Sequence, residues 1–176
     1  MHKIGWYIAK VKCKFKKSYE PLSEYYRAGG AKIGYNCCIC SDLDECNKEM
    51  INIGNDCTIS TQVCFVTHDH SIFHVRHKWG DLWGRIIIGN NCFIGERSVI
   101  MYGVKLADNT IVAAGSVVTK SFTEGGIIIG GNPAKKIGTC DDFLKKYGDN
   151  HFDGKKDFLR ALENDDDERF IKRREY

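Results

Sequence analysis

Aliphatic residues recur at every sixth position from residue 85 to 123. Written in sixes, six consecutive units open with Ile, Leu or Val, and in four of them Gly or Ala follows directly. The opening residues are Ile88, Ile94, Ile100, Leu106, Val112 and Val118. An α-helix disfavours glycine and β-branched residues at this frequency, and a flat strand has a period of two. A period of six is typical of a β-solenoid, in which short strands turn a corner in every unit and successive coils stack.

A shift of three units superimposes like residues on like. Ile88 then falls on Leu106, Ile94 on Val112 and Ile100 on Val118. The fifth positions of the units are mostly small or β-branched: Cys92, Ser98, Val104, Thr110, Ser116 and Phe122. We therefore expect a triangular coil with one unit per side, rungs about 4.8 Å apart and the aliphatic residues stacked inward.

The repeat is bounded and twice interrupted, which predicts the domain organisation. We expect an N-terminal helical cap at residues 1–30, an all-β solenoid domain at 31–138 and a C-terminal helical extension at 139–176. Between Ile39 and Ile53 two residues exceed the period, so a bulge is expected within Asp44 to Lys48. The repeat breaks again for a protruding, aromatic loop at 71–85, and long loops that interrupt a repeat are usually functional.

The first helical segment is basic and amphipathic. Its apolar residues recur at helical spacing among lysines: Ile4, Tyr7, Ile8, Val11 and Phe15. Such a helix can cover the open end of a solenoid, and it can also lie on an anionic membrane surface. The pattern favours the cap without excluding peripheral membrane contact.

Composition and cysteine usage narrow the function classes. The formal net charge of +3 is too small to indicate a nucleic-acid partner. The 9 cysteines are an odd number and no signal peptide is apparent, which predicts reduced thiols in a cytoplasmic protein. Three of them (Cys37, Cys57 and Cys92) occupy fifth positions and are expected in the core. The Cys37–Cys46 cluster lacks a second cysteine pair at zinc-site spacing.

Histidines gather where the repeat breaks. Four of the chain's 6 histidines fall within ten residues: His68, His70, His74 and His77. Spacing alone is compatible with structural histidines, with a metal site and with a general base. A second candidate is basic, since Lys120, Lys135 and Lys136 follow the last regular coil and could gather on phosphate oxygens.

The motif Thr67-His68-Asp69 before a loop, followed by IIIGNNCFIGERSVIMYGVKLADNTIVAAGSVVTK and IIIGGNPAKKI, resembles one enzyme family. The resemblance is to the hexapeptide-repeat acyltransferases with a left-handed parallel β-helix, nearest to the maltose/galactoside and polysaccharide O-acetyltransferases. It covers roughly residues 25 to 147. The left hand is implied only by this resemblance, because general chirality rules favour a right-handed crossover. It also implies acetyl-CoA as co-substrate, no metal, and a homotrimer with active sites between subunits.

Site residues follow from the resemblance, position by position. His68 would act as general base on an acceptor hydroxyl of a surface polysaccharide or its precursor, with Asp69 orienting the ring. Backbone amides at Glu96 and Ala114 would contact the thioester and the pantetheine arm. The coenzyme phosphates would meet Lys120 and Lys135 or Lys136. The acceptor would be held by Asp42, with Asn47 as the weaker candidate, together with His70, Trp79 and Trp83 from the loop region.

Three further functions remain compatible with the sequence. A zinc-dependent hydrolyase of the carbonic-anhydrase kind uses the same solenoid, but it needs a histidine from a second coil or subunit. An N-acetyltransferase acting on an amino sugar would share the coenzyme and the base. A non-catalytic scaffold would bind neither coenzyme nor zinc.

Overall fold

The computed structural model describes residues 2–43, 47–164 and 168–171. The chain divides into two compact units, Met1–Ile137 and Gly138–Tyr176. Each unit is described by itself.

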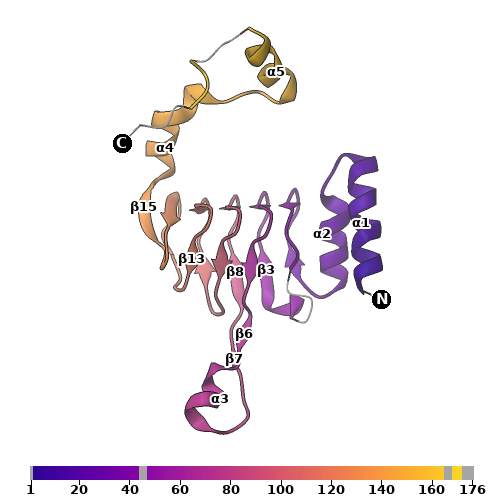
Figure 1. Cartoon of the computed structure of the whole chain (residues 1–176), viewed down its shortest axis with the longest axis vertical. Helices are drawn as coiled ribbons and strands as arrows, with labels where there is room; N and C mark the ends of the chain where they lie inside the picture. The colour runs from indigo at the N-terminus through magenta and orange to yellow at the C-terminus, as the bar shows by residue number, and fades with distance from the viewer. Residues whose placement is uncertain (1, 44–46, 165–167, 172–176) are drawn as a thin grey trace. The chain divides into compact units, whose positions relative to one another are not determined.

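Three sheets form the sides of a stacked coil in the first unit (Figure 1). Sheet A consists of β1 (Lys32–Ile33), β3 (Ile51–Ile53), β8 (Ile86–Ile88) and β11 (Lys105–Leu106). Sheet B consists of β2 (Cys38–Ile39), β4 (Thr58–Ile59), β9 (Phe93–Ile94), β12 (Ile111–Val112), β14 (Ile127–Gly130) and β15 (Lys135–Thr139). Sheet C consists of β5 (Cys64–Phe65), β10 (Val99–Ile100) and β13 (Val117–Val118). The chain visits A, B and C in turn and then returns to A, so each circuit is one coil.

The register agrees with the three-unit shift predicted from the sequence. Leu106 pairs with Ile88 in sheet A, Val112 with Ile94 in sheet B, and Val118 with Ile100 in sheet C, all in parallel. These three predicted pairs are confirmed. Each short strand bonds its backbone N–H and C=O groups to the strands of the coils above and below it, and these bonds hold the coils in register.

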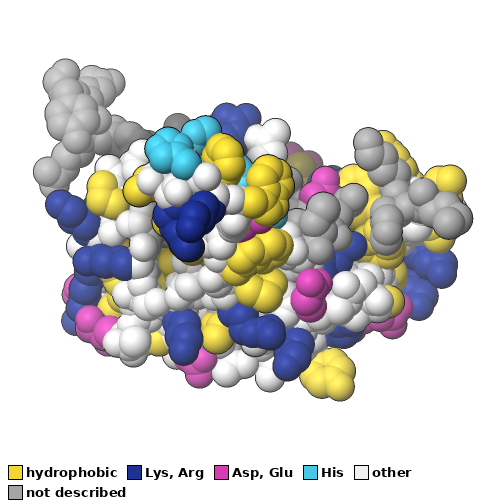
Figure 2. All heavy atoms as spheres, turned by 90° about the horizontal axis from the view of Figure 1, so that it is seen from below, with side chains coloured by type: hydrophobic (Ala, Val, Ile, Leu, Met, Phe, Trp, Pro, Cys, Tyr) yellow, Lys and Arg dark blue, Asp and Glu magenta, His cyan; other side chains and the backbone are white. Residues whose placement is uncertain are grey.

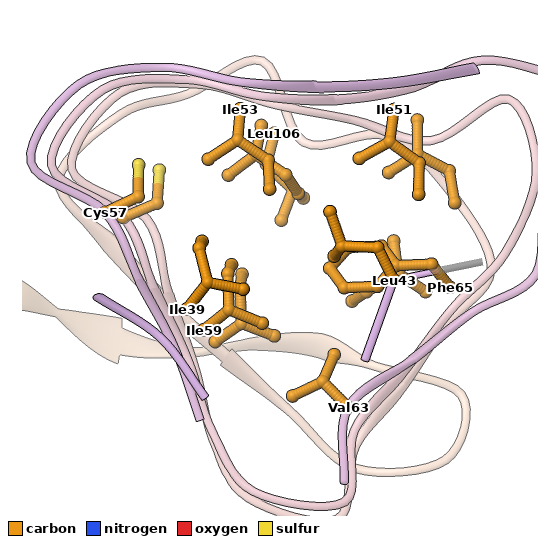
Figure 3. Close-up of a cluster of buried hydrophobic side chains, with 14 of the residues drawn as sticks. Ile39, Leu43, Ile51, Ile53, Cys57, Ile59, Val63, Phe65 and Leu106 are labelled. Atoms are coloured by element: carbon orange, nitrogen blue, oxygen red, sulfur yellow. The ribbon is translucent and has the colours of Figure 1, made fainter. Parts of the chain in front are cut away.

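The core lies inside the triangle. Figure 3 shows Ile39 and Ile59 stacked from one side, Ile53 and Leu106 from another, and Phe65 beside Leu43. Ile39, Ile59, Ile94 and Val112 are completely buried. Burying one such side chain contributes about 1.5–3 kcal/mol, so these columns supply much of the stability of the stack.

The cysteines at fifth positions are buried, as predicted, and fifth positions with a thiol or hydroxyl also make hydrogen bonds. The Cys57 thiol donates to the Gly89 carbonyl at 3.1 Å, and the Cys92 thiol donates to the Ala107 carbonyl at 3.3 Å. Thr110 donates to the same Ala107 oxygen at 2.7 Å. A small side chain with a thiol or hydroxyl donor therefore forms hydrogen bonds with the carbonyl groups at the turns between sheets A and B.

The second interruption is more ordered than the loop expected at 71–85. Strands β6 (His68–Asp69) and β7 (Leu82–Trp83) pair antiparallel, and helix α3 (Ser71–Arg76) lies between them. We call residues 68–84 the arm. The Asp69 carboxylate accepts from the Ser71 amide at 2.9 Å and so starts the helix. The predicted bulge within Asp44 to Lys48 falls partly on residues 44–46, outside the described residues; Lys48–Met50 form the short helix η1.

Two helices precede the coil. Helices α1 (His2–Lys16) and α2 (Glu20–Ala28) pack together, and α2 contacts strands β1 and β2 of the first coil. The buried Tyr26 hydroxyl accepts from the Trp6 indole at 2.9 Å and donates to the Ser41 carbonyl at 3.1 Å. One side chain thus links α1, α2 and the first coil.

The second unit is helical, in agreement with the periodicity after Cys140. It contains α4 (Cys140–Tyr147), η2 (Gly148–Asn150) and α5 (Lys155–Glu163). The Thr139 hydroxyl caps α4 by accepting from the Asp142 amide at 3.1 Å. Arg169 bonds Asp157 at 2.6 Å and holds the segment after α5 against that helix.

Candidate functional site

Two corners of the coil carry the residues singled out in the sequence. The C–A corner is where the chain leaves sheet C for sheet A, and in the second coil it carries the arm. The B–C corner is where the chain leaves sheet B for sheet C, at residues 40–43, 60–63, 95–98 and 113–116. The inward residues of the strands between the corners are buried and cannot contact a substrate.

His68 lies at the base of the arm on the C–A corner. Its ring stacks on Trp83 with centroids 4.5 Å apart and an interplanar angle of 15°. Its Nδ1 atom is 3.1 Å from the Asn47 amide nitrogen and 3.4 Å from the hydroxyl of the buried Thr67. The ring is therefore held at its Nδ1 edge and on one face, and among the described residues no hydrogen bond reaches its Nε2 atom.

Asn47 is placed under His68 by the stacking of the coils. It comes from the same corner one coil earlier, and it is 6% exposed. An amide nitrogen at Nδ1 corresponds to a ring protonated at Nε2, whereas the amide oxygen at Nδ1 corresponds to a ring protonated at Nδ1. The structure has the amide nitrogen at Nδ1; a half-turn of the Asn47 amide would place its oxygen there and leave Nε2 as the nitrogen that can accept a proton.

Asp69 contacts the arm and the next coil. Hydrogen bonds from the Ser71 hydroxyl and amide hold the pKa of the Asp69 carboxyl below its ordinary value, and the Tyr102 hydroxyl adds to the effect. The same contact raises the pKa of Tyr102. Asp69 therefore fastens α3 and the base of the arm to the third coil.

The rest of the arm is aromatic. His70 Nδ1 lies 2.6 Å from the Asp81 carboxylate, and its ring stacks on Phe73 at 5.0 Å. The Trp79 ring lies 4.6 Å from the His70 ring and is 84% exposed, more than Trp83 at 52%. Figure 2 views the molecule from the side on which the arm projects, where histidine and hydrophobic side chains gather beside basic ones. These rings offer an apolar platform next to His68.

The B–C corner presents backbone groups. The Glu96 carbonyl accepts from the Gly115 amide at 2.8 Å. Across the described ranges, the N–H groups of Glu96 and Ala114 have no such acceptor, and both residues are exposed. Two stacked N–H donors at one edge of a rigid coil are suited to binding carbonyl or anionic oxygens. The Glu96 side chain turns toward Arg97 at 3.7 Å.

The predicted lysines differ in their surroundings. The Lys136 ammonium is paired with the Glu124 carboxylate at 2.6 Å. Lys120 lies over the Phe122 ring at 5.5 Å, and Lys135 is exposed. Lys120 and Lys135 therefore offer more available positive charge for a phosphate than Lys136.

The two candidates for holding the acceptor lie at different corners. Asn47 contacts His68, whereas Asp42 lies on the B–C corner, 3.4 Å from the Tyr26 hydroxyl. Asp42 and its neighbours line a groove of about 520 Å³ that also includes Thr61, Gln62 and Cys64. Within one chain Asp42 thus shares a corner with Glu96 and Ala114, not with His68.

The structure gathers the predicted residues into two half-sites. His68, Asp69 and the arm form one, and Glu96, Ala114 and Asp42 form the other. One side of the coil separates them, on the order of 15–20 Å at about 3.3 Å per residue. Sequence reasoning missed Thr67, Asp81 and Tyr102 as partners of the histidines and of Asp69. Their signal is weak, because each is a common residue whose role depends on stacking between coils.

The histidines do not converge on a metal centre. Within residues 2–43, 47–164 and 168–171, no three His, Cys, Asp or Glu side chains are grouped so as to hold a metal ion. The zinc hydrolyase considered from the sequence therefore has no ligand set within the described part of one chain.

Sequence comparisons place the chain among acyl-transfer proteins. Residues 85–120 match a family model described as the hexapeptide repeat of succinyl-transferase. The protein CapG of Staphylococcus aureus is 42% identical over 126 residues, which cover 69% of this chain and 73% of CapG. The galactoside O-acetyltransferase of Escherichia coli (strain K12) is 30% identical over 129 residues, 73% of this chain and 63% of that enzyme.

Solved structures agree with these sequence matches. A galactoside acetyltransferase in complex with coenzyme A superimposes with a TM-score of 0.54 at 25% identity, covering 77% of this chain and 76% of that one. A maltose O-acetyltransferase from Clostridium difficile 630 gives a TM-score of 0.53 at 23% identity, covering 78% and 87%. The latter supports the fold alone.

Proposed function

Because the chain belongs to the hexapeptide-repeat acyltransferase family, we propose that it transfers the acetyl group of acetyl-CoA to a sugar hydroxyl. The observation that carries the proposal is the pair of half-sites. One presents an imidazole fixed by Asn47 and Trp83, and the other presents the Glu96 and Ala114 amides. An acyl transfer needs both a base for the acceptor and donors for the carbonyl oxygen of the donor substrate.

His68 acts as general base in this scheme. With the Asn47 amide oxygen at Nδ1, the ring carries its proton there, and Nε2 removes the proton from the acceptor hydroxyl. The acceptor oxygen bonds to the thioester carbon, the C–S bond breaks, and the imidazolium returns its proton to the sulfur. Acetyl-CoA supplies an activated acetyl group, so no covalent acyl-enzyme is required when both substrates are held together.

The B–C corner fits the thioester and the pantetheine arm. The Glu96 and Ala114 N–H groups would bind oxygens that gain charge in the transition state. Lys120 and Lys135 would meet the coenzyme phosphates, with Lys136 contributing only if it leaves Glu124. The relative solved with coenzyme A bound supports this assignment of the donor substrate.

The half-sites can meet between subunits of a homotrimer. Outward positions are apolar on sheet B, at Phe93, Ile111 and Ile128, and on sheet C, at Val99 and Val117. Sheet A instead turns Lys32, Asn52, Ile87 and Lys105 outward. In a threefold assembly that turns sheet C toward the axis, the His68 corner of one protomer would lie beside the B–C corner of the next.

Further features are inferred from family membership and from the residues. The coil would be left-handed, the α1–α2 pair would cap its first coil, and reduced cysteines fit a cytoplasmic location. The aromatic arm suits the apolar faces of a sugar ring, which favours a glycan or its precursor over a small polar acceptor. Trp79 and Trp83 would contact this acceptor, and Asp42 of the adjoining protomer would bind its hydroxyls.

His68→Ala tests the base directly. Loss of a general base typically lowers turnover by about 10²–10⁴-fold, with coenzyme binding and assembly unchanged. His74→Ala is the matched control, because His74 is exposed on the arm. Free-thiol release from acetyl-CoA with a panel of sugar acceptors measures both. Near-normal turnover of His68→Ala would refute the assignment, and stoichiometric zinc without coenzyme binding would favour the hydrolyase.

Mixing inactive variants tests the shared site. His68→Ala removes one half-site, and Ala114→Trp places a large exposed side chain across the other. If each site combines two protomers, random co-assembly of equal amounts restores about one quarter of the wild-type activity. If both half-sites act within one chain, the mixture stays inactive.

A further inference from the structure

Helix α1 exposes an apolar stripe on the side opposite its packed face. Ile4, Tyr7, Ile8, Val11 and Phe15 recur at helical spacing and are exposed by 67%, 62%, 51%, 50% and 85%. The packed face is formed by Ala9, which is buried, by Gly5, which approaches Tyr25, and by the half-buried Cys13. The stripe therefore lies mostly outside the packing of α1 on α2, with Ile8 at its edge beside Pro21 and Tyr25.

Basic residues border this stripe on both sides. The 15 residues of α1 include five lysines and neither Asp nor Glu. Lys10 and Lys14 follow one edge of the stripe at helical spacing, and Lys12 and Lys16 lie toward the other. All four side chains are exposed. An exposed apolar stripe between two rows of ammonium groups matches the boundary between acyl chains and anionic headgroups.

A cavity on one flank of the helix has the same character. It measures about 550 Å³ and is lined by Lys10, Lys14 and Lys17 together with the apolar Leu22 and Ile39. Lysines beside apolar walls suit an amphiphile with a negative headgroup. Among the described residues, none of the helices could span a bilayer. An amphipathic helix of 15 residues would lie in the plane of such a surface.

We propose that α1 binds an anionic lipid surface, with its apolar stripe inserted at the level of the acyl chains and its lysines among the headgroups. A second copy of the helix is a poorer partner, because two surfaces without acidic residues would repel each other. Nucleic acid would neutralise the lysines but leave Ile8 and Phe15 exposed to water. This proposal does not depend on the acyl-transfer reaction.

Vesicle co-sedimentation of the full chain tests the proposal. Binding is expected to vesicles of phosphatidylglycerol mixed with phosphatidylcholine, to weaken with added salt, and to be far weaker with phosphatidylcholine alone. Lys12→Gln with Lys14→Gln should lower the partition coefficient by about 30-fold, at about 1 kcal/mol per lysine. Ile8→Ser with Phe15→Ser should lower it by at least about tenfold. Both pairs of positions are exposed, so coenzyme binding should be unchanged.

Helix α4 supplies matched controls for both variants. Leu144 is 68% exposed and is followed by Lys145 and Lys146. Leu144→Ser, and Lys145→Gln with Lys146→Gln, should leave vesicle binding unchanged. Absence of binding to the anionic vesicles, or equal losses in the α4 and α1 variants, would overturn the proposal. It would also fail if the α1 substitutions altered only the oligomeric state by light scattering, because the stripe would then be a contact between copies.

Discussion

Replacing Asn47 by alanine should slow catalysis without removing the base. The Asn47 amide is nearly buried and lies 3.1 Å from His68 Nδ1. In the resting state this contact joins two neutral groups and contributes about 0.5–1.5 kcal/mol, whereas a hydrogen bond to a charged ring contributes about 1.5–3 kcal/mol. The proposed scheme requires the Asn47 amide oxygen turned toward Nδ1. In that orientation the contact strengthens by about 1–2 kcal/mol in the transition state, because the ring becomes charged as it takes the acceptor's proton.

That difference corresponds to a decrease in kcat of about 5- to 30-fold for Asn47→Ala. The decrease should be smaller than that of His68→Ala, because Trp83 still holds the ring face. KM for acetyl-CoA should be unchanged, since the coenzyme is expected at the other corner. Asn47→Asp should restore part of the rate and move the acidic limb of the rate profile to higher pH, because a carboxylate favours the protonated ring.

Steady-state kinetics across pH, with acetyl-CoA and a responsive sugar acceptor, would measure these effects. Lys32→Ala is a suitable control, because Lys32 is an exposed residue of the same coil on sheet A, away from both half-sites. Two results would refute the reasoning: an Asn47→Ala enzyme as fast as the wild type, or one as slow as His68→Ala. A change confined to KM for the acceptor would instead assign Asn47 to substrate binding.

Three further outcomes are expected. Glu96→Ala removes an exposed carboxylate from the path expected for the negatively charged coenzyme. Initial-rate measurements should therefore give a lower KM for acetyl-CoA, while thermal stability should change little. Gly95→Ala should lower the free energy of unfolding, measured by urea denaturation, by about 2–4 kcal/mol. The reason is that an added Cβ would lie 2.5 Å from a backbone atom of the next coil. Gly80→Ala is the control, because an added Cβ there would have open space around it. Hydrogen bonding to Arg169 lowers the pKa of the Asp157 carboxyl to about 2. This contact is therefore stabilising above the ordinary carboxyl pKa of about 4 and is lost as pH falls toward about 2. Asp157→Asn should unfold more easily than the wild type at neutral pH, by circular dichroism, and equally easily in strong acid.

The sequence could predict the coil because one physical constraint is repeated in every unit. Each inward aliphatic residue must stack on its equivalent one coil away, so the pairing of Ile94 with Val112 follows from counting residues. The same counting fails between Ile39 and Ile53, where two residues exceed the period. The residue beneath His68 is decided within that irregular segment, which is why Asn47 was a weaker candidate than Asp42 from the sequence.

The arm was predicted as a loop for a different reason. Helix α3 has only six residues, fewer than two turns, and its start depends on a side-chain contact from Asp69. Periodicity cannot detect so short an element. The His70–Asp81 pair, eleven positions apart, closes the arm and likewise gives no periodic signal.

The arm is separate from the stacked coil, so the choice of acceptor and the binding of the coenzyme depend on different parts of the molecule. Its base is closed by the antiparallel pairing of His68 with Trp83, so residues between them can change without shifting the register of any coil. The coenzyme half-site, by contrast, is made of backbone amides whose positions are fixed by ladder bonds such as that from Gly115 to Glu96. Substitutions at Phe73 or Trp79 should therefore alter the choice of acceptor without affecting coenzyme binding, whereas a change in coil packing would affect both substrates. An acyltransferase built this way can acquire a new acceptor through its arm alone, while the stacked coil that binds the donor stays the same.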